Sequence, residues 1–364
     1  MSPVDAAFEP PFCPNPECRF HADPRGWRWK RNGHFERRAE PQWIQRYVCS
    51  HCRRHFSSQT FSTTYWLKRA DLPQRLFLRL VACSGYRQIA RDLGVSPTTV
   101  LRQVERLGRH CLLFHDRHRP RELGEPLVVD GFETFEYSQY TPVHFHTAVG
   151  AASHFVYGFT DSELRRKGRM TDAQRRRRAA LERILGRPHP RSIEREMGRL
   201  LEIVAPPGTR VQLRSDEHPA YPRAVARVEG RAIEHERTLS TVARTPRNPL
   251  FPANLLDLLI RHSSANHKRE TIAFSKRRQS AAERLFVLVV WRNYLKSFSE
   301  RARDATPAQR LGVVERRLGV EDVLVERIFP SRAALPARWE DYYWRRIATR
   351  RIPNGRTHAL RYAA

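Results

Sequence analysis

The spacing of apolar residues changes along the chain and divides it into three kinds of segment. Residues about 10–57 carry short strand-like stretches, and residues about 70–112 carry apolar positions three and four apart, as amphipathic helices do. From about residue 125, short apolar runs predict strands, and a longer apolar helix is expected over 281–298. The pattern predicts an α/β chain in which a mixed sheet follows a small N-terminal unit and an all-α unit.

Cysteine spacing changes the reading of the N-terminal segment. The two pairs are Cys13 with Cys18 (C-x4-C) and Cys49 with Cys52 (C-x2-C). Each pair can place two thiolates on one metal ion, and four sulfurs form a closed tetrahedral site that suits structural zinc. We expect the chain to stay inside the cell, where thiols are reduced, so disulfides are not expected. Residues 1–60 are therefore predicted to be a zinc ribbon, with a hairpin turn at Asn32-Gly33.

The helical segment, assigned to residues 61–122, has the pattern of a helix-turn-helix. Two apolar stripes are separated at Gly94, and Ser96 followed by Pro97 is a typical start for the second helix. The polar residues that this arrangement turns outward, and that we expect to contact DNA, are Thr98, Thr99, Arg102, Gln103 and Arg106. An ordinary helical hairpin with a solvated polar face is the alternative.

Two carboxylates end apolar strands in the second half of the chain. The run 127–131 contains Asp130, and the run 211–216 ends on Asp216. Two such strands can set their carboxylates side by side, where like charges repel unless a metal ion lies between them. We therefore expect these aspartates to share a metal site.

The order of these features resembles that of the DDE transposases of bacterial insertion sequences, over residues about 10–298. The motifs that carry the resemblance are Val129-Asp130-Gly131, Arg214-Ser-Asp216 followed by His218, and Asn266-His-Lys-Arg-Glu270 with Lys276-Arg277-Arg278. The resemblance implies an RNase H-like catalytic domain over 123–300, in which Asp130, Asp216 and Glu270 bind two Mg²⁺ or Mn²⁺ ions. It also implies binding of double-stranded DNA, both terminal inverted repeats and target DNA, by a homodimer or larger assembly.

The third acid has two candidates. Glu270 matches the Asn-x-x-x-Glu helix of the family, and Glu283 lies on the next predicted helix. The basic residues that flank Glu270, and that could hold the scissile strand, are Lys268, Arg269, Lys276 and Arg277. Relative to compact members of the family, residues about 162–204 are a basic helical insertion, which could clamp DNA or form a solvated face. The basic C-terminal extension, 301–364, could touch DNA or another subunit.

Charge supports a nucleic-acid partner. The chain has 66 Lys and Arg against 38 Asp and Glu, a net charge of +28, which favours a polyanion through counterion release. No apolar stretch is long enough to span a membrane, no signal-peptide pattern opens the chain, and no Gly-rich phosphate loop is present. We expect a cytoplasmic, nucleoid-associated protein that uses no nucleotide cofactor.

Two other functions fit the same sequence. One is a catalytically inactive, transposase-derived regulator that uses only the ribbon and the helix-turn-helix to bind DNA. The other is a structure-specific nuclease that cuts without joining. Convergence of the acids on a common metal site would separate an active enzyme from the regulator.

Overall fold

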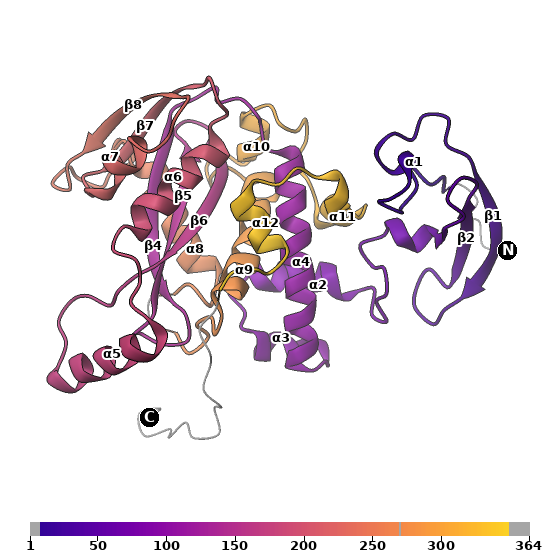
Figure 1. The fold of residues 1–364 in the computed structure, drawn as a ribbon, viewed down its shortest axis with the longest axis horizontal. Coiled ribbons are helices and arrows are strands. Elements are labelled where there is room, and N and C mark those ends of the chain that lie inside the picture. The colour runs from indigo at the N-terminus through magenta and orange to yellow at the C-terminus, as the bar shows by residue number, and fades with distance from the viewer. Residues whose placement is uncertain (1–7, 269–270, 349–364) are drawn as a thin grey trace.

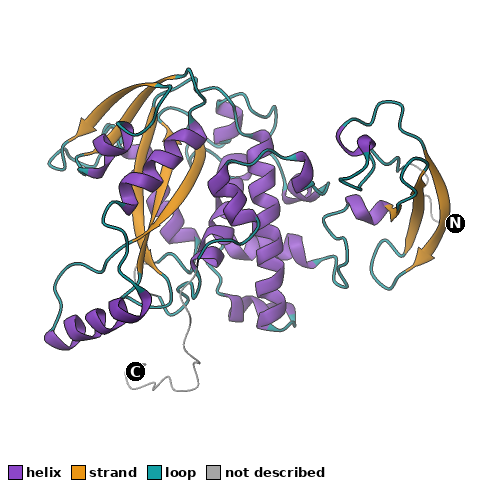
Figure 2. Cartoon of the chain, in the orientation of Figure 1, coloured by secondary structure: helices purple, strands orange, loops and turns teal. Residues whose placement is uncertain are grey.

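The computed structural model of the protein describes residues 8–268 and 271–348. A three-stranded sheet lies at one end of the longest axis and a five-stranded sheet at the other, with the long helix α4 (Pro97–His118) between them (Figure 1). Many of the helices lie between the two sheets (Figure 2). The mixed α/β class expected from the sequence is confirmed.

The N-terminal sheet joins β1 (Trp29–Glu36), β2 (Trp43–Cys49) and β3 (His55–Ser57) in antiparallel order, after the short helix α1 (Arg19–Ala22). The hairpin turn predicted at Asn32-Gly33 is wrong. Gly33 has φ 66° and lies inside β1, where the register with β2 shifts between Arg31 and His34. The chain reverses later, where the Arg37 N–H donates to the Gln42 carbonyl at 2.9 Å. The left-handed conformation that glycine permits therefore makes a bulge within the strand.

The helical unit consists of α2 (Leu72–Val81), α3 (Tyr86–Leu93) and α4. The predicted turn is confirmed: Gly94 ends α3 with φ 63°, and Ser96 Oγ accepts the Thr99 N–H at 3.0 Å at the start of α4. Pro97 occupies the first turn of α4, as expected. This helix continues to His118 and buries its last turns, so it belongs to the helix-turn-helix at one end and to the main core at the other.

The large sheet has the order β6-β5-β4-β7-β8. Its strands are β4 (Leu127–Phe135), β5 (Pro142–Gly150), β6 (Val156–Glu163), β7 (Arg210–Asp216) and β8 (Ala232–Thr238). Strands β4, β5 and β6 pair antiparallel, whereas β7 runs parallel to both β4 and β8. This mixed five-stranded sheet is consistent with the RNase H-like class.

The segment between β6 and β7, predicted to be one basic helical insertion, consists of two helices with different surroundings. Helix α5 (Asp172–Leu185) has no buried residue and projects from the rest of the chain (Figure 1). Helix α6 (Ser192–Val204) instead buries Met197, Leu200 and Leu201 in the main core. The exposed insertion is thus confined to α5, and α6 is a structural helix of the large-sheet unit.

Three further helices complete this unit. They are α7 (Ala220–Val225), α8 (Phe251–Ser263) and α9 (Arg278–Val290), the last followed by a π-helical turn over Trp291–Leu295. Helix α9 is buried along nearly its whole length, packed against α4 and in contact with α2 and α8. The helix-turn-helix therefore shares one continuous apolar core with the large sheet.

The C-terminal segment folds back along its own chain. Its helices are α10 (Pro307–Arg310), α11 (Val320–Leu324) and α12 (Ala337–Tyr343). Buried Trp339 donates from Nε1 to the Phe159 carbonyl at 3.1 Å, and Arg338 Nη2 donates to Asp161 Oδ1 at 2.8 Å. Further back, the Arg327 N–H donates to the Phe61 carbonyl at 2.8 Å. The segment thus joins the outer strand of the sheet to the zinc-ribbon end of the chain.

The close contact between α4 and α9 predicts that a methyl group added at Gly108 would destabilise the fold. A Cβ on Gly108 would lie 2.4 Å from the Glu283 carbonyl oxygen and 2.7 Å from Glu283 Cβ. Alanine would add about 1 kcal/mol of helix propensity, but separating two packed helices costs about 1–3 kcal/mol or more. We expect Gly108→Ala to lower the free energy of unfolding, measured by urea denaturation. Gly124→Ala is the matched control, because no atom lies within 4 Å of its added methyl group; a Gly108 variant as stable as this control would contradict the close packing.

Candidate active site and metal centre

Asp130 and Asp216 come from adjacent parallel strands. In the β4–β7 pair, Leu127 lies opposite Leu213 and Val128 opposite Arg214. Two residues further along each strand are Asp130 and Asp216, so the register brings the carboxylates to neighbouring positions. Backbone amides orient them: Gly131 N–H donates to Asp130 Oδ1 at 2.7 Å, and His218 N–H donates to Asp216 Oδ1 at 2.9 Å.

The electrostatics of the pair match this proximity. The pKa of Asp130 is raised to about 6, mainly by burial; the negative charge of Asp216 also raises it, whereas the Gly131 N–H and the charge of Arg244 lower it. A carboxylate in this position is short of positive charge. A hard divalent cation between oxygen ligands would supply that charge, so the pair fits Mg²⁺ chemistry.

Two histidines that the sequence reasoning did not select, His144 and His146, lie on β5 opposite Glu133 and Gly131 of β4. Burial, and next the charge of His218, lower the pKa of His144 to about 4, so its imidazole is neutral at pH 7. A Cβ on Gly131 would lie 2.2 Å from His144 Cε1, so glycine after Asp130 allows the ring to pack on β4. The sequence signal was the His144-Phe-His146 spacing, which puts both rings on one face of a strand; the rings meet at 3.1 Å between their Nδ1 atoms.

A third carboxylate approaches the same region from α8. Burial raises the pKa of Tyr221 well above its usual value, and the charges of Asp130, Asp216 and Asp257 add to that rise. Tyr221 is buried on α7, so the charges of all three aspartates act on one phenol. The side chain of Asp257, on the apolar helix α8, is half-buried. The three aspartates are candidates for a single acidic centre.

The other proposed third acids stand differently. Glu270, together with Arg269, lies outside the described residues. The predicted helix around Asn266 is wrong for the part that is described: α8 ends at Ser263, and residues 264–268 form turns in which buried Asn266 donates to Ser275 Oγ at 3.0 Å. Glu283 faces α4 and the C-terminal segment, where its Oε1 lies 3.1 Å from Arg345 Nε. Burial raises the pKa of Glu283 to about 7 despite that arginine, and its packing against Gly108 explains the burial without a metal.

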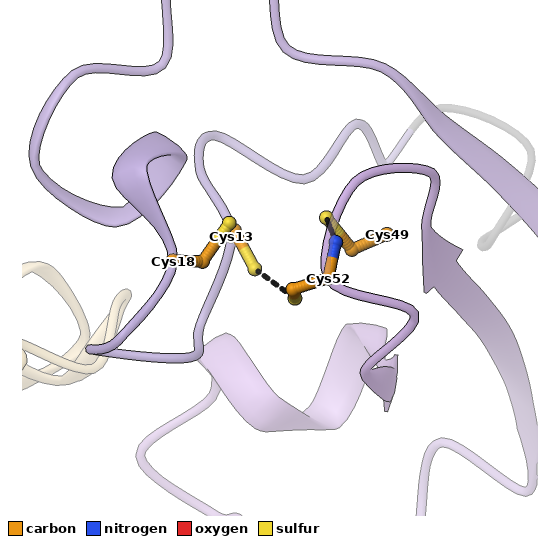
Figure 3. A group of neighbouring side chains, drawn as sticks. All are labelled: Cys13, Cys18, Cys49 and Cys52. Carbon is orange, nitrogen blue, oxygen red and sulfur yellow. Dashed lines mark hydrogen bonds between the residues drawn. The ribbon is translucent and has the colours of Figure 1, made fainter.

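The four predicted cysteine ligands meet at the N-terminal end. Their sulfur atoms all lie within 4.8 Å of one another, with Cys13 and Cys52 at 3.6 Å (Figure 3). Cys13 and Cys18 come from the turn before α1, and Cys49 and Cys52 from the turn after β2. Within residues 8–268 and 271–348, this is the only group of three or more His, Cys, Asp or Glu residues close enough to share an ion. The cluster fits a zinc ribbon, and the three aspartates are not drawn together as tightly.

Hydrogen bonds prepare one sulfur of the cluster for a metal ion. Burial opposes ionisation of Cys49, yet its pKa is lowered to about 7 because Trp27 Nε1 and the backbone N–H groups of Cys52 and His51 donate to the sulfur. Burial raises the pKa of Cys13, its nearest neighbours being other thiols. Four such sulfurs become thiolates together only with a cation among them.

The helix-turn-helix presents only part of its predicted DNA face. Thr98 and Arg102 are exposed, whereas Thr99 hydrogen-bonds to the N-cap residue Ser96 and Gln103 is half-buried. Arg106 Nη2 donates to the Thr63 carbonyl at 2.8 Å. Burial lowers the pKa of Arg106, and the positive charges of Arg327 and Arg109 lower it further.

Other exposed cations lie near the helix-turn-helix and near the aspartates. Arg87 and Arg91 on α3, which the sequence reasoning did not select, flank a depression of about 370 Å³ at the turn before α4. Lys268 and Lys276 are exposed, and Arg277 precedes α9. The exposed Arg244 lies close enough to Asp130 to act on its charge. The structure also has no helix, in its described part, with the length and apolar character of a membrane span.

No family model matches the chain. Among solved structures, one similar chain belongs to the cryo-EM structure of the simian T-cell lymphotropic virus intasome in complex with PP2A regulatory subunit B56 gamma. It is 18% identical in sequence, and the match covers 65% of this chain and 71% of that chain, with a TM-score of 0.25. A TM-score this low defines neither fold nor activity, so the candidate site rests on the residues of this chain.

Proposed function

We propose that the protein is a DNA transposase that binds the terminal inverted repeats of its element and cuts and joins DNA phosphodiesters. The observation that carries the proposal is the pair formed by Asp130, inside β4, and Asp216, at the end of the adjacent parallel strand β7, with the pKa of Asp130 raised by burial and by Asp216. Their carboxylates, with that of Asp257 or Glu270, would hold divalent metal ions. Such ions, when bound, activate the attacking oxygen and stabilise the leaving oxygen of a phosphoryl transfer.

The remaining surfaces supply DNA binding for this role. Thr98 and Arg102 project from the start of α4, in the position where a helix-turn-helix contacts base edges and phosphates. Arg244 and Lys268 are exposed on the catalytic unit, where they can neutralise phosphates of the strand to be cut. Synapsis of two element ends requires at least two copies of the chain, so we propose a dimer or a larger assembly.

A second candidate is an inactive, transposase-derived regulator. It is favoured by one observation: the three aspartates do not form as compact a ligand group as the four cysteines do. The two functions share DNA binding and differ in chemistry, so only an assay that detects broken and joined strands separates them.

The test is a strand-transfer reaction with the full, zinc-loaded chain and DNA that carries the ends flanking its own gene. With Mg²⁺ or Mn²⁺ we expect nicked ends and products joined to a target plasmid, and no product in EDTA. Joined products with metal and none without support the transposase. Cleavage without joining indicates a nuclease, and tight binding of the ends without cleavage under either metal indicates the regulator.

A further inference from the structure

A groove separates the zinc ribbon from the C-terminal segment. Its volume is about 1410 Å³, and its walls come from β1, β2 and β3, from residues 65–68, and from 327–344. The ribbon lies at the opposite end of the long axis from β4 and β7 (Figure 1). The groove is therefore remote from Asp130 and Asp216, and its occupant is a separate question from the chemistry of that pair.

The groove is strongly cationic. The basic side chains that line it are Arg37, Arg38, Arg46, Arg54, Lys68 and Arg327. Arg37 is used locally, donating to the Pro41 carbonyl at 2.9 Å, but no carboxylate among the described residues forms an ion pair with any of the other five. The one acidic residue in the walls is Glu340, which already lies 3.3 Å from Arg346. Arg327, in the C-terminal wall, donates to the Thr60 carbonyl at 3.2 Å and lies over the rings of Tyr65 and Phe329. The cations without a carboxylate partner on the opposite wall, Arg38, Arg46, Arg54 and Lys68, favour a polyanionic occupant.

Aromatic faces are open among these charges. Trp66 is 81% exposed and Trp344 52% exposed, one on each side of the groove. Trp66 has φ 62°, a left-handed conformation that is strained for a bulky residue. Its indole is not part of the cluster of buried aromatic residues that contains Phe56, Phe61 and Phe329. A large apolar ring held in solvent beside unpaired arginines is the composition of a base-stacking surface.

We propose that this groove binds single-stranded nucleic acid, with Trp66 and Trp344 stacking on bases and Arg38, Arg54 and Lys68 contacting phosphates. A duplex hides its base faces, so it would use the cations and leave the two indoles idle. The net charge of +28 disfavours a second copy of this chain as the occupant of the groove. Residues 351–364 are also disfavoured as occupant, because they contain arginines and no acidic residue. Electrostatic repulsion thus opposes both of these occupants in this groove.

The test measures binding of a fluorescein-labelled oligo(dT) of about 20 nucleotides and of a duplex of equal length by fluorescence anisotropy. We expect the double variant Trp66→Ala, Trp344→Ala to raise the Kd for oligo(dT) by about 10-fold or more, since each stacked base contributes about 1–3 kcal/mol. Duplex affinity should change less than about 2-fold. Lys68→Ala should weaken oligo(dT) binding less and reduce its dependence on salt.

Trp43→Ala is the matched control, because Trp43 is an exposed ribbon tryptophan (47%) outside the groove walls; it should leave the Kd unchanged. Asp130→Asn should also bind oligo(dT) as the wild type does, which separates this inference from the proposed activity. Unchanged oligo(dT) affinity in the double variant, with zinc content intact, would overturn the proposal. Equal losses for oligo(dT) and duplex would reassign the groove to duplex DNA, and displacement of oligo(dT) by poly-glutamate at equal charge would show an unspecific polyanion site.

Discussion

Replacing Asp130 or Asp216 by asparagine should abolish DNA cleavage and joining while DNA binding is retained. Asparagine keeps the shape of the side chain and one oxygen, so the acceptor for the Gly131 or His218 N–H survives. The charge that would hold a divalent cation is lost, and without it the developing charge on the phosphate is not stabilised. We expect the rate of strand cleavage to fall by at least about 10³-fold. It is measured on labelled end DNA, with binding followed in parallel by gel shift.

The same substitution should stabilise the folded protein slightly. The pKa of Asp130 is raised to about 6 from 3.8, chiefly by burial, so its ionised form disfavours folding at pH 7. Stability contributed by the protonated form is lost as pH rises through the folded pKa. Removing the ionisable group removes that loss, and we expect Asp130→Asn to gain on the order of 1 kcal/mol at pH 7. A variant that loses activity and stability together would indicate a structural aspartate.

The same cleavage assay distinguishes the candidates for the third metal-binding carboxylate. If Asp257 completes the centre, Asp257→Asn will be as inactive as Asp130→Asn and Glu270→Gln will remain active. If the family motif assigns the residue correctly, the two results exchange. Glu283→Gln serves as the control, because Glu283 contacts Arg345 and α4; it should cut DNA normally. Activity in the Asp130 and Asp216 variants would remove the proposed site altogether.

The sequence predicted the features that depend on local chemistry. Two cysteine pairs at this spacing favour a common metal ion, so the cysteine cluster could be predicted without tertiary information, whereas the metal site at Asp130 and Asp216 stays a prediction. Asp257 could not, because a single acid on an apolar helix has the same pattern whether it faces solvent or a neighbouring carboxylate. Its position depends on how α8 packs on β4, which only the fold specifies.

The same reason explains why some polar residues contact other parts of the chain. Arg106 has the spacing of a DNA-facing residue, but the Thr63 loop and Arg327, more than two hundred residues apart in sequence, cover it. The extension 301–364 was expected to touch DNA or another subunit, but its Trp339 and Tyr342 are buried, and Trp339 donates to the Phe159 carbonyl of β6. The sequence pattern of a helix predicts which of its faces is polar. It does not predict whether that face contacts solvent or another part of the chain.

Removing zinc should unfold the zinc ribbon. The ribbon has a small core: Tyr47, Phe56 and Phe61 pack beside the cysteines, and most of β1 is exposed. Structural zinc contributes about 10–16 kcal/mol of apparent binding energy in such small units, far more than this core can replace. We expect one zinc per chain by elemental analysis, and loss of amide protection over residues 13–57 after chelation, measured by hydrogen exchange.

The loss should spread to the C-terminal segment, because the two are joined. His21 Nε2 lies 2.8 Å from Ser331 Oγ, and Thr63 Oγ1 donates to the Leu324 carbonyl at 2.7 Å. Cys49→Ser should reproduce the effect of chelation, whereas Cys83→Ser, a half-buried cysteine outside the cluster, should not. Since the groove walls are the ribbon and this segment, oligo(dT) binding should be lost with the zinc while the large sheet keeps its protection. A chelated protein with an unchanged exchange pattern would show that the ribbon folds without metal.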